Sequence, residues 1–382
     1  MKALITANPN TAVVEDIPVP ELGAKDIRVK VHSIALNPVD SLYVAHPSDQ
    51  PGRVVGSDVA GVIDEIGDEV KQWKVGDRVA GLLQGATSGN PRPGGFAEYA
   101  ILEEDLAIRI PSGVSFEEAA TLPLCSLTAA QALFIRLDIN APFPSPLNFA
   151  ETQIESPAIL VYSGATSLGL FTIGLARLLR TPAGHRYRIY ATASPKNHDK
   201  LLALGVNEVF DYRSPTWPDD VRKASGGISY AVDCISEDSS TALLSQTFVE
   251  AGGKIAVIRK SAWHKEGVRD DVVPLYGAVW SGLGHEIRYN NEILPASPSW
   301  REFTVAFFKF LSAGSADDHT KFPILPNPVR LMPGGLERVV ADGFSLLGSG
   351  KVIDRTSSNV TDGDDWMKPI SAEKLVYHVF GA

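Results

Sequence analysis

Hydrophobic positions in the middle of the chain form a short run and then a long one, separated by small polar residues. Residues 158–162 read AILVY, an apolar run of the length that predicts a strand buried on both faces. Residues 163–169 read SGATSLG, and residues 170–179 read LFTIGLARLL, a nearly unbroken apolar segment that predicts a helix packed on a sheet. The pattern therefore predicts a strand, a tight turn and a helix.

Four more apolar runs follow this unit at regular intervals. They cover residues 187–194, 208–212, 230–234 and 254–258, with a short helical segment that ends at Gly205 between the first two. Strands that alternate with helices at this spacing are typical of a parallel, doubly wound sheet. The central part of the chain is therefore predicted to be an α/β domain with a Rossmann-like sheet.

The first third of the chain has a different pattern. Residues 27–34, 61–67 and 77–82 alternate or run apolar between glycines and prolines, as in a small β-barrel. Residues 136–157 are rich in proline and are predicted to form an exposed loop. Because the end of the chain carries no second nucleotide turn, we expect it to return to the first domain. The first domain is therefore predicted to contain residues 1–135 and 300–382. Residues 136–157 are the loop, and residues 158–299 form the sheet domain.

The turn at 163–169 has the features of a pyrophosphate site. Small residues let the backbone approach a phosphate, whose charge is stabilised at the helix N-terminus. The match is S-x-x-T-x-x-G, because Ser163 and Thr166 replace the first two glycines of the dinucleotide fingerprint. A small-residue turn before a core helix is the alternative, but the strands that follow favour a dinucleotide. The predicted phosphate-binding residues are Ser163, Thr166, Ser167, Leu168 and Gly169.

The end of the second strand predicts the type of cofactor. NAD sites place an acid there for the ribose 2′-hydroxyl, whereas residues 194–197 read SPKN and contain none. We therefore predict NADPH, with Ser194, Lys196 and Asn197 around the 2′-phosphate, Tyr212 beside the ribose or the nicotinamide-side phosphate, and Ile258 after the fifth strand. The alternative for Lys196 is a solvated lysine at the start of a helix, and the alternative for Tyr212 is an aromatic residue at the edge of the core.

Composition limits the possible partners and compartments. The 382 residues suffice for two domains, and the net charge of −10 argues against nucleic acid and anionic membranes as partners. The chain shows no signal peptide and no apolar run long enough to span a membrane, so a cytoplasmic location is expected. Its two cysteines, Cys125 and Cys234, stand far apart in apolar surroundings and are predicted to be buried thiols.

Short motifs over nearly the whole chain resemble the medium-chain dehydrogenase/reductase superfamily, with its GroES-like and Rossmann-like domains. They are NPVD at 37–40, GSDVAG at 56–61, VGDRV at 75–79, GGFAEY at 94–99, AATLP at 119–123 and SAEKLVY at 371–377. The zinc enzymes of that superfamily need a cysteine where this chain has Asn37 and Pro38, a His-Glu pair where it has Ser57 and Asp58, and a four-cysteine lobe. With two cysteines the chain cannot build the family's catalytic or structural zinc site, and His285, in a His-Glu pair far downstream, is expected in a loop.

The motifs NPVD, SPKN, VFDY at 209–212 and the C-terminal tail are most similar to fungal trans-acting enoyl reductases of polyketide biosynthesis. This resemblance implies hydride transfer from NADPH to the β-carbon of an α,β-unsaturated polyketide acyl chain, carried on a partner polyketide synthase, by a monomeric enzyme. Two features depart from the family pattern. Residues 353–370 are an insertion, expected to be an exposed polar loop, and Leu42 stands where many relatives have lysine.

The resemblance also implies roles for individual residues. Thr128 is expected beside the nicotinamide; the alternative is that it is only a helix N-cap. Tyr43 is expected to be a phenolic proton donor; the alternative is that it is only an aromatic residue in the pocket wall. Asp40 is expected to fix its loop by hydrogen bonds, and solvent is an alternative source of the proton. The expected cofactor contacts of this loop are Val39, Asp40, Ser41 and Leu42. The expected substrate residues are Ala129, Gln131, Ala132, Tyr276, Val279 and Trp280. The alternative for residues 275–280 is that they form the last strand of the sheet or a strand at an interface.

Two other functions agree with the same residues. The first is a free-standing NADPH quinone or enone reductase for small diffusible substrates. The second is a cofactor-binding partner of a synthase that has lost redox chemistry, since Leu42 and the altered turn depart from the family pattern.

Overall fold

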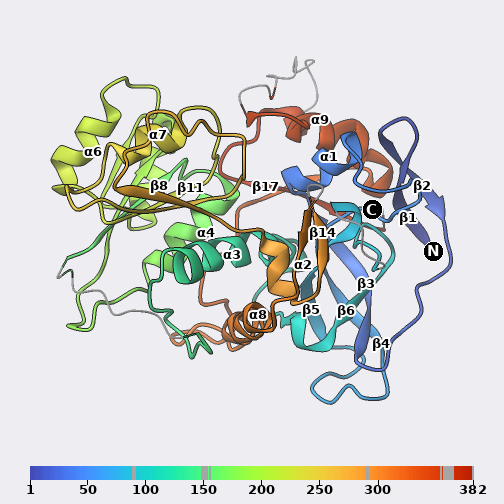
Figure 1. Ribbon diagram of the computed structural model, residues 1–382. Helices are drawn as coiled ribbons and strands as arrows, with labels where there is room; N and C mark the ends of the chain where they lie inside the picture. The colour runs from blue at the N-terminus through green and yellow to red at the C-terminus, as the bar shows by residue number, and fades with distance from the viewer. Residues whose placement is uncertain are drawn as a thin grey trace. The chain divides into compact units, whose positions relative to one another are not determined.

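The computed structural model describes residues 1–87, 92–147, 154, 156–289, 292–352, 355 and 365–380. The chain divides into two compact units, one of Met1–Leu124 with Trp280–Ala382 and one of Cys125–Val279 (Figure 1). Among the described residues, none of the helices is both long and apolar enough to cross a membrane.

The unit Cys125–Val279 contains a six-stranded parallel sheet of order β10-β9-β8-β11-β12-β13. Its strands are β8 (Ala158–Tyr162), β9 (Arg188–Thr192), β10 (Glu208–Phe210), β11 (Tyr230–Asp233), β12 (Gly253–Val257) and β13 (Val272–Tyr276). Its helices are α3 (Pro123–Ala130, which begins just before this unit), the π-helix η3 (Gln131–Arg136), α4 (Ser167–Ala176), the 3₁₀ turn η4 (Pro195–Asn197), α5 (His198–Ala203), α6 (Trp217–Ser225) and α7 (Ser240–Ser245).

The strand order explains where the helices pack. The chain moves outward from β8 through β9 to β10 and then returns to β11 and β12 on the other side of β8. Since parallel crossovers are right-handed, α4 and α5 cover one face of the sheet and α6 and α7 the other, and Figure 1 shows α4 apart from α6 and α7 across β8 and β11. The carboxyl ends of all six strands therefore share one edge, where ligands of such sheets bind.

The other unit contains a seven-stranded, mostly antiparallel sheet of order β16-β17-β3-β4-β5-β7, with β6 paired to β3. These strands are β3 (Asp26–Ala35), β4 (Asp58–Ile66), β5 (Arg78–Leu82), β6 (Tyr99–Glu103), β7 (Ala107–Arg109), β16 (Val329–Met332) and β17 (Lys374–His378). Two hairpins add β1 (Lys2–Ala7) with β2 (Thr11–Asp16) and β14 (Ile287–Tyr289) with β15 (Glu292–Leu294).

The helical segments of this unit are α1 (Pro38–Ala45), α2 (Phe116–Ala120), α8 (Pro298–Ser312), α9 (Ser345–Leu347), the π-helix η7 (Val339–Phe344) and the 3₁₀ turns η1 (Gly85–Thr87), η2 (Glu104–Leu106), η5 (Val279–Leu283, which begins in the other unit), η6 (Gly335–Arg338) and η9 (Asp365–Met367). The fold predicted from the sequence, a strand-rich GroES-like domain and a Rossmann-like sheet, is confirmed. Residues 125–135 belong to the unit with the parallel sheet, and residues 280–299 belong to the other unit.

Two segments predicted as exposed loops are partly packed. Residues 137–147 lack helix and strand as expected, but Phe143 is buried and its ring meets Phe134 edge-on at 5.7 Å. Residues 148–153 and 155 of that loop lie outside the described residues. Of the 353–370 insertion, the structure describes residue 355 and residues 365–370.

The described end of this insertion is anchored rather than free. Arg330 is 7 % exposed, and its guanidinium donates hydrogen bonds to the carbonyl oxygens of Trp366 at 3.0 Å and Pro369 at 3.1 Å. Trp366, Met367 and Ile370 pack against the core of the strand-rich unit. The prediction of an exposed loop is therefore wrong for these residues, because their apolar side chains outweigh the polar composition of the insertion as a whole.

Candidate functional site

The turn between β8 and α4 has the geometry that a pyrophosphate site needs. Ser163 has a φ of +59°, the left-handed conformation that explains why glycine is usual at this position. A Cβ on Gly169 would lie 2.6 Å from the carbonyl oxygen of Ser163 and 2.7 Å from the Cα of Gly164, so only glycine lets α4 approach β8 this closely. Ser163 and Gly169, the first and last positions of the dinucleotide fingerprint, thus keep its backbone geometry, although the first is serine instead of glycine.

Thr166 is the N-cap of α4. Its hydroxyl donates to the carbonyl oxygen of Ser163 at 2.9 Å and accepts a hydrogen bond from the N–H of Gly169 at 3.0 Å. The hydroxyl therefore already holds the turn in shape, and a phosphate would be bound chiefly by the helix N-terminus with its positive dipole. Ser167 and Leu168 are the first two residues of α4 and lie at this terminus.

The other predicted cofactor residues follow neighbouring strands at the same edge of the sheet. Ser194, Lys196 and Asn197 come directly after β9, and Tyr212 comes after β10, which pairs with β9. The amide of Asn197 donates to the Ser194 hydroxyl at 3.4 Å, whereas Lys196 is exposed and has no carboxylate partner among the described residues. A cation without an internal partner next to a hydroxyl fits a phosphate ligand.

Tyr212 is 41 % exposed, and the Arg213 guanidinium lies 5.7 Å from the centre of its ring. Arg213, which the sequence pattern did not single out, also pairs with Asp211 at 2.9 Å. On the other side of β8, Ile258 directly follows β12, and its N–H donates to the Ser236 hydroxyl at 2.9 Å. The structure thus brings the predicted cofactor residues of this unit to one edge of its sheet.

A second group of predicted residues gathers around η3. Thr128 lies inside α3, so the alternative that it is a helix N-cap is wrong. The side-chain amide of Gln131 donates to the carbonyl oxygen of Val279 at 3.1 Å. Ala129 and Ala132 are fully buried, and Tyr276 ends β13, the last strand of the sheet.

Arg136 joins these segments and was missed by sequence reasoning. Its guanidinium donates to the carbonyl oxygens of Gly277 at 3.1 Å and Thr128 at 3.4 Å. Burial lowers the pKa of this guanidinium to about 10, which leaves it charged at neutral pH. Short π-helical segments such as η3 are frequent at functional sites, but the apolar sequence around Arg136 gave no signal of it.

In the strand-rich unit, the loop residues form a buried hydrogen-bond network. The Ser57 hydroxyl donates to Asp40 at 2.7 Å, and the backbone N–H of Asn37 donates to the same carboxyl at 2.8 Å. Burial raises the pKa of Asp40 to about 7. The Ser41 hydroxyl donates to the carbonyl oxygen of Gly348 at 2.6 Å, so both side chains fix α1 in place, while Val39 and Leu42 are half-buried on the same helix.

Asp58 connects this network to the C-terminal strand. Its carboxylate is fully buried and accepts hydrogen bonds from the Asn37 amide at 2.9 Å, the Leu124 N–H at 2.8 Å and the Lys374 ammonium at 2.6 Å. Lys374 is 3 % exposed. Asn37 and Asp58 therefore bond each other, Asp58 also bonds an internal ammonium group, and Ser57 bonds Asp40.

Tyr43 lies on α1 with its ring 5.8 Å from that of Tyr289, and it is 6 % exposed. Trp280 is buried at the start of the C-terminal part of this unit. His285 lies in a loop, as predicted, and contacts Glu103 at 3.0 Å. Both cysteines are buried free thiols, as predicted, and burial raises the pKa of Cys234.

Comparison with known proteins agrees with this fold. Residues 23–112 match the alcohol dehydrogenase GroES-like domain. The CurK enoyl reductase structure superposes with a TM-score of 0.70 at 18 % identity, covering 99 % of this chain and 98 % of the other. A putative zinc-dependent alcohol dehydrogenase from Rhizobium etli reaches 0.72 at 22 % identity, covering 100 % and 99 %. The molecule therefore has the fold of the medium-chain alcohol dehydrogenases and reductases.

Proteins of similar sequence show to which family within this fold the chain belongs. Enoyl reductase cheB of Chaetomium globosum is 33 % identical, with 88 % of this chain and 87 % of the relative covered. Trans-enoyl reductase ACTTS2 of Alternaria alternata is also 33 % identical, with 92 % and 96 % covered. The chain belongs to the trans-enoyl reductase family, and it is an oxidoreductase of the kind that uses a nicotinamide cofactor.

Proposed function

We propose that this protein is an NADPH-dependent enoyl reductase whose chemistry is zinc-free and which reduces the α,β double bond of a polyketide acyl chain. The chain would be delivered on the acyl carrier of a separate polyketide synthase, in the cytoplasm. The observation that carries the cofactor choice is the end of β9, where residues 194–197 contain no acid and Lys196, beside Ser194, has no carboxylate partner in the part of the chain that the structure describes.

The backbone at β8 and α4 fits a dinucleotide. Gly169 permits the close approach of helix and strand, Ser163 makes the left-handed turn, and Thr166 caps the first turn of α4 through the Gly169 N–H, which holds the helix N-terminus in shape for the pyrophosphate. When bound, the nicotinamide supplies the hydride for the β-carbon of the substrate.

Zinc-free chemistry is supported by the donors around Asp58. A metal ion at Asn37, Ser57 and Asp58 would have to displace the Lys374 ammonium, which contacts the carboxylate at 2.6 Å. A side chain must then stabilise the charge that develops on the thioester carbonyl oxygen. We assign this hydrogen bond to the Thr128 hydroxyl and delivery of the α-proton to the Tyr43 phenol.

Residues on α3, η3 and the segment after β13 are proposed to contact the acyl chain. Arg136 bonds both Thr128 and Gly277 through their carbonyl oxygens and so holds these segments together. Gln131 does the same with Val279.

The protein is proposed to be a monomer. β13 is one of the two edge strands of the parallel sheet, and it carries Pro274 at its centre, a residue type that disfavours pairing of an edge strand with another copy. Sedimentation at micromolar concentration should give the mass of one chain, and a stable dimer would contradict the proposal.

Enzyme assays test the activity. Purified protein is mixed with NADPH or NADH and with an α,β-unsaturated acyl chain on a carrier protein, the same chain as a pantetheine thioester, or a quinone. We expect NADPH oxidation with the thioesters, the highest kcat/KM with the carrier-bound chain, and a saturated product by mass spectrometry. Faster turnover of the quinone would indicate the small-molecule reductase, and NADPH binding without oxidation would indicate a redox-silent partner of a synthase.

A further inference from the structure

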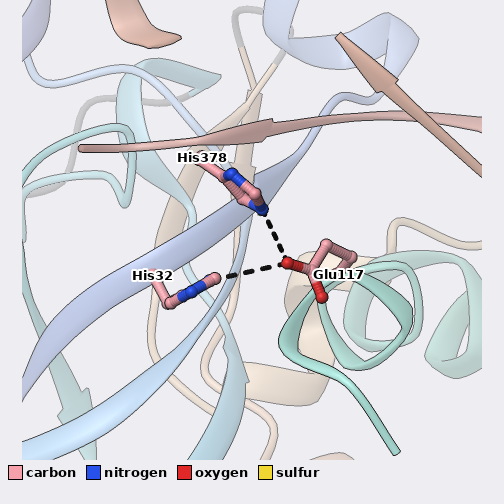
Figure 2. Close-up of side chains that lie close together, drawn as sticks. All are labelled: His32, Glu117 and His378. Carbon is pink, nitrogen blue, oxygen red and sulfur yellow. Dashed lines mark hydrogen bonds and ion pairs between the residues drawn. The ribbon is translucent and has the colours of Figure 1, made fainter. Parts of the chain in front are cut away.

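Three side chains from distant parts of the sequence meet on the surface of the strand-rich unit. They are His32 on β3, Glu117 in the first turn of α2 and His378 at the end of β17, and Figure 2 shows both imidazoles directed at the carboxylate. His378 Nε2 lies 2.6 Å from Oε1 of Glu117, and His32 Nδ1 lies 3.8 Å from the same oxygen. One donor atom from each residue lies within 4.8 Å of the other two.

The backbone holds the three residues in fixed positions. β17 pairs antiparallel with β3, and the N–H of Val379 donates to the carbonyl oxygen of His32 at 3.0 Å. The start of α2 is fixed by a capping box in which Ser115 and Glu118 bond each other's backbone N–H groups. The His32 ring is also stacked on Phe116 with 4.7 Å between the ring centres. The donors therefore need only small side-chain rotations to converge.

We propose that His32, Glu117 and His378 bind a divalent transition-metal ion of the zinc class. Two imidazoles and one carboxylate are a donor set that Zn²⁺ accepts, with bonds of about 2.0–2.2 Å and a fourth position left for water. Copper, nickel and cobalt ions favour the same nitrogen ligands. The three side chains are 45 %, 22 % and 28 % exposed, so an ion can enter from solvent.

The charges around the cluster are compatible with a cation. The Glu117 carboxylate supplies one negative charge. Arg78 is a neighbouring cation, but its guanidinium is held by other groups: it donates to the carbonyl oxygens of Pro111 and Val114 and lies over the Phe116 ring. A bound ion would join β3, α2 and β17, and it would stabilise the fold because the unfolded chain does not hold these ligands together.

The test uses the full-length protein after dialysis against a chelator. Zn²⁺ is titrated by calorimetry, and Co²⁺ is followed by its visible absorption, which reports the coordination geometry. We expect one Zn²⁺ per chain, with His32→Gln, His378→Gln and Glu117→Gln each weakening the affinity by about tenfold or more. Zn²⁺ should also raise the unfolding temperature of the natural protein more than that of these variants.

His285→Gln is the matched control, since His285 is also paired with a glutamate, Glu103, and should leave Zn²⁺ binding unchanged. Glu117→Gln keeps an amide that can bond His378, so its fold should be intact by circular dichroism. The proposal is overturned if the natural protein binds no Zn²⁺, or if folded Glu117→Gln and His32→Gln variants bind Zn²⁺ and give the Co²⁺ spectrum as the natural protein does.

Discussion

Single side chains at the end of β9 are proposed to set the preference for NADPH. Replacing Lys196 by alanine removes one charged hydrogen bond to the 2′-phosphate, worth roughly 1.5–3 kcal/mol. NADPH affinity should fall by about ten- to a hundredfold, whereas NADH affinity should stay the same because NADH lacks that phosphate. Fluorescence titration of both cofactors measures the two changes.

Lys223 provides the control for this substitution. It is an exposed lysine on α6 of the same unit, so Lys223→Ala changes the net charge by the same amount without touching the end of β9. Equal loss of NADPH affinity in both variants would show a general charge effect and would refute the assignment of Lys196.

Asp40 should make the stability of the protein depend on pH. Its raised pKa of about 7 means that the folded protein binds this proton more tightly than the unfolded chain. Asp40 therefore stabilises the fold at low pH, and this contribution is lost between about pH 4 and pH 7, at up to about 1.4 kcal/mol per pH unit.

The variant Asp40→Asn isolates this contribution. Its amide can donate to the Ser57 hydroxyl and accept from the Asn37 N–H, so both hydrogen bonds are kept without a titrating group. Relative to the natural protein, the variant should gain stability as the pH rises from 4 to 7, measured by urea unfolding at each pH. A constant difference over this range would show that Asp40 does not titrate there.

At the level of elements, the β8 and α4 unit depends on the contact between Gly169 and Ser163. In Gly169→Ala the new methyl group would lie 2.6 Å from a backbone oxygen, so the helix must move away from the strand. We expect loss of NADPH binding by at least tenfold together with a lower unfolding temperature, and Thr166→Ser, which keeps the capping hydroxyl, should change both little. Normal NADPH affinity in folded Gly169→Ala would contradict a pyrophosphate site at this turn.

The elements of the parallel sheet could be predicted from the sequence because their signals are local. The predicted runs at 158–162, 208–212, 230–234 and 254–258 became β8, β10, β11 and β12; β8 has the predicted bounds, and the ends of the other three differ by one or two residues. The runs of β8, β11 and β12 are apolar because these central strands are largely buried, and this shows in the sequence without knowledge of their neighbours, whereas β10, at an edge of the sheet, is exposed or half-buried.

The buried polar groups could not be predicted in the same way. Lys374 lies in the motif SAEKLVY and Asp58 in the motif GSDVAG, yet neither motif indicates that the two side chains meet across 316 positions of the chain. Glu117 and His378 likewise meet across 261 positions. Pairing of this kind is set by strand order and register, which a single sequence does not reveal.

At the scale of the whole molecule, the two ends of the chain complete one unit. β17, near the C-terminus, pairs with β3, and β3 pairs in turn with β4, which carries Asp58. The bond between Asp58 and Lys374 therefore links the returning segment to the N-terminal barrel in its interior. Removing one member of such a pair leaves an uncompensated buried charge, whereas removing both does not.

This difference gives a double-mutant test. Lys374→Met should lower the free energy of unfolding by about 3–5 kcal/mol, because Asp58 keeps its charge without the ammonium. Asp58→Asn in the same chain removes that charge, and the Asn37 amide can turn to bond the new side chain, so the double variant should be more stable than Lys374→Met alone. Urea unfolding followed by circular dichroism measures all three proteins and the Asp58→Asn single variant. If the double variant were as unstable as the sum of the two single variants, the two groups would act independently, and the unit would not depend on this bond to hold its C-terminal strand.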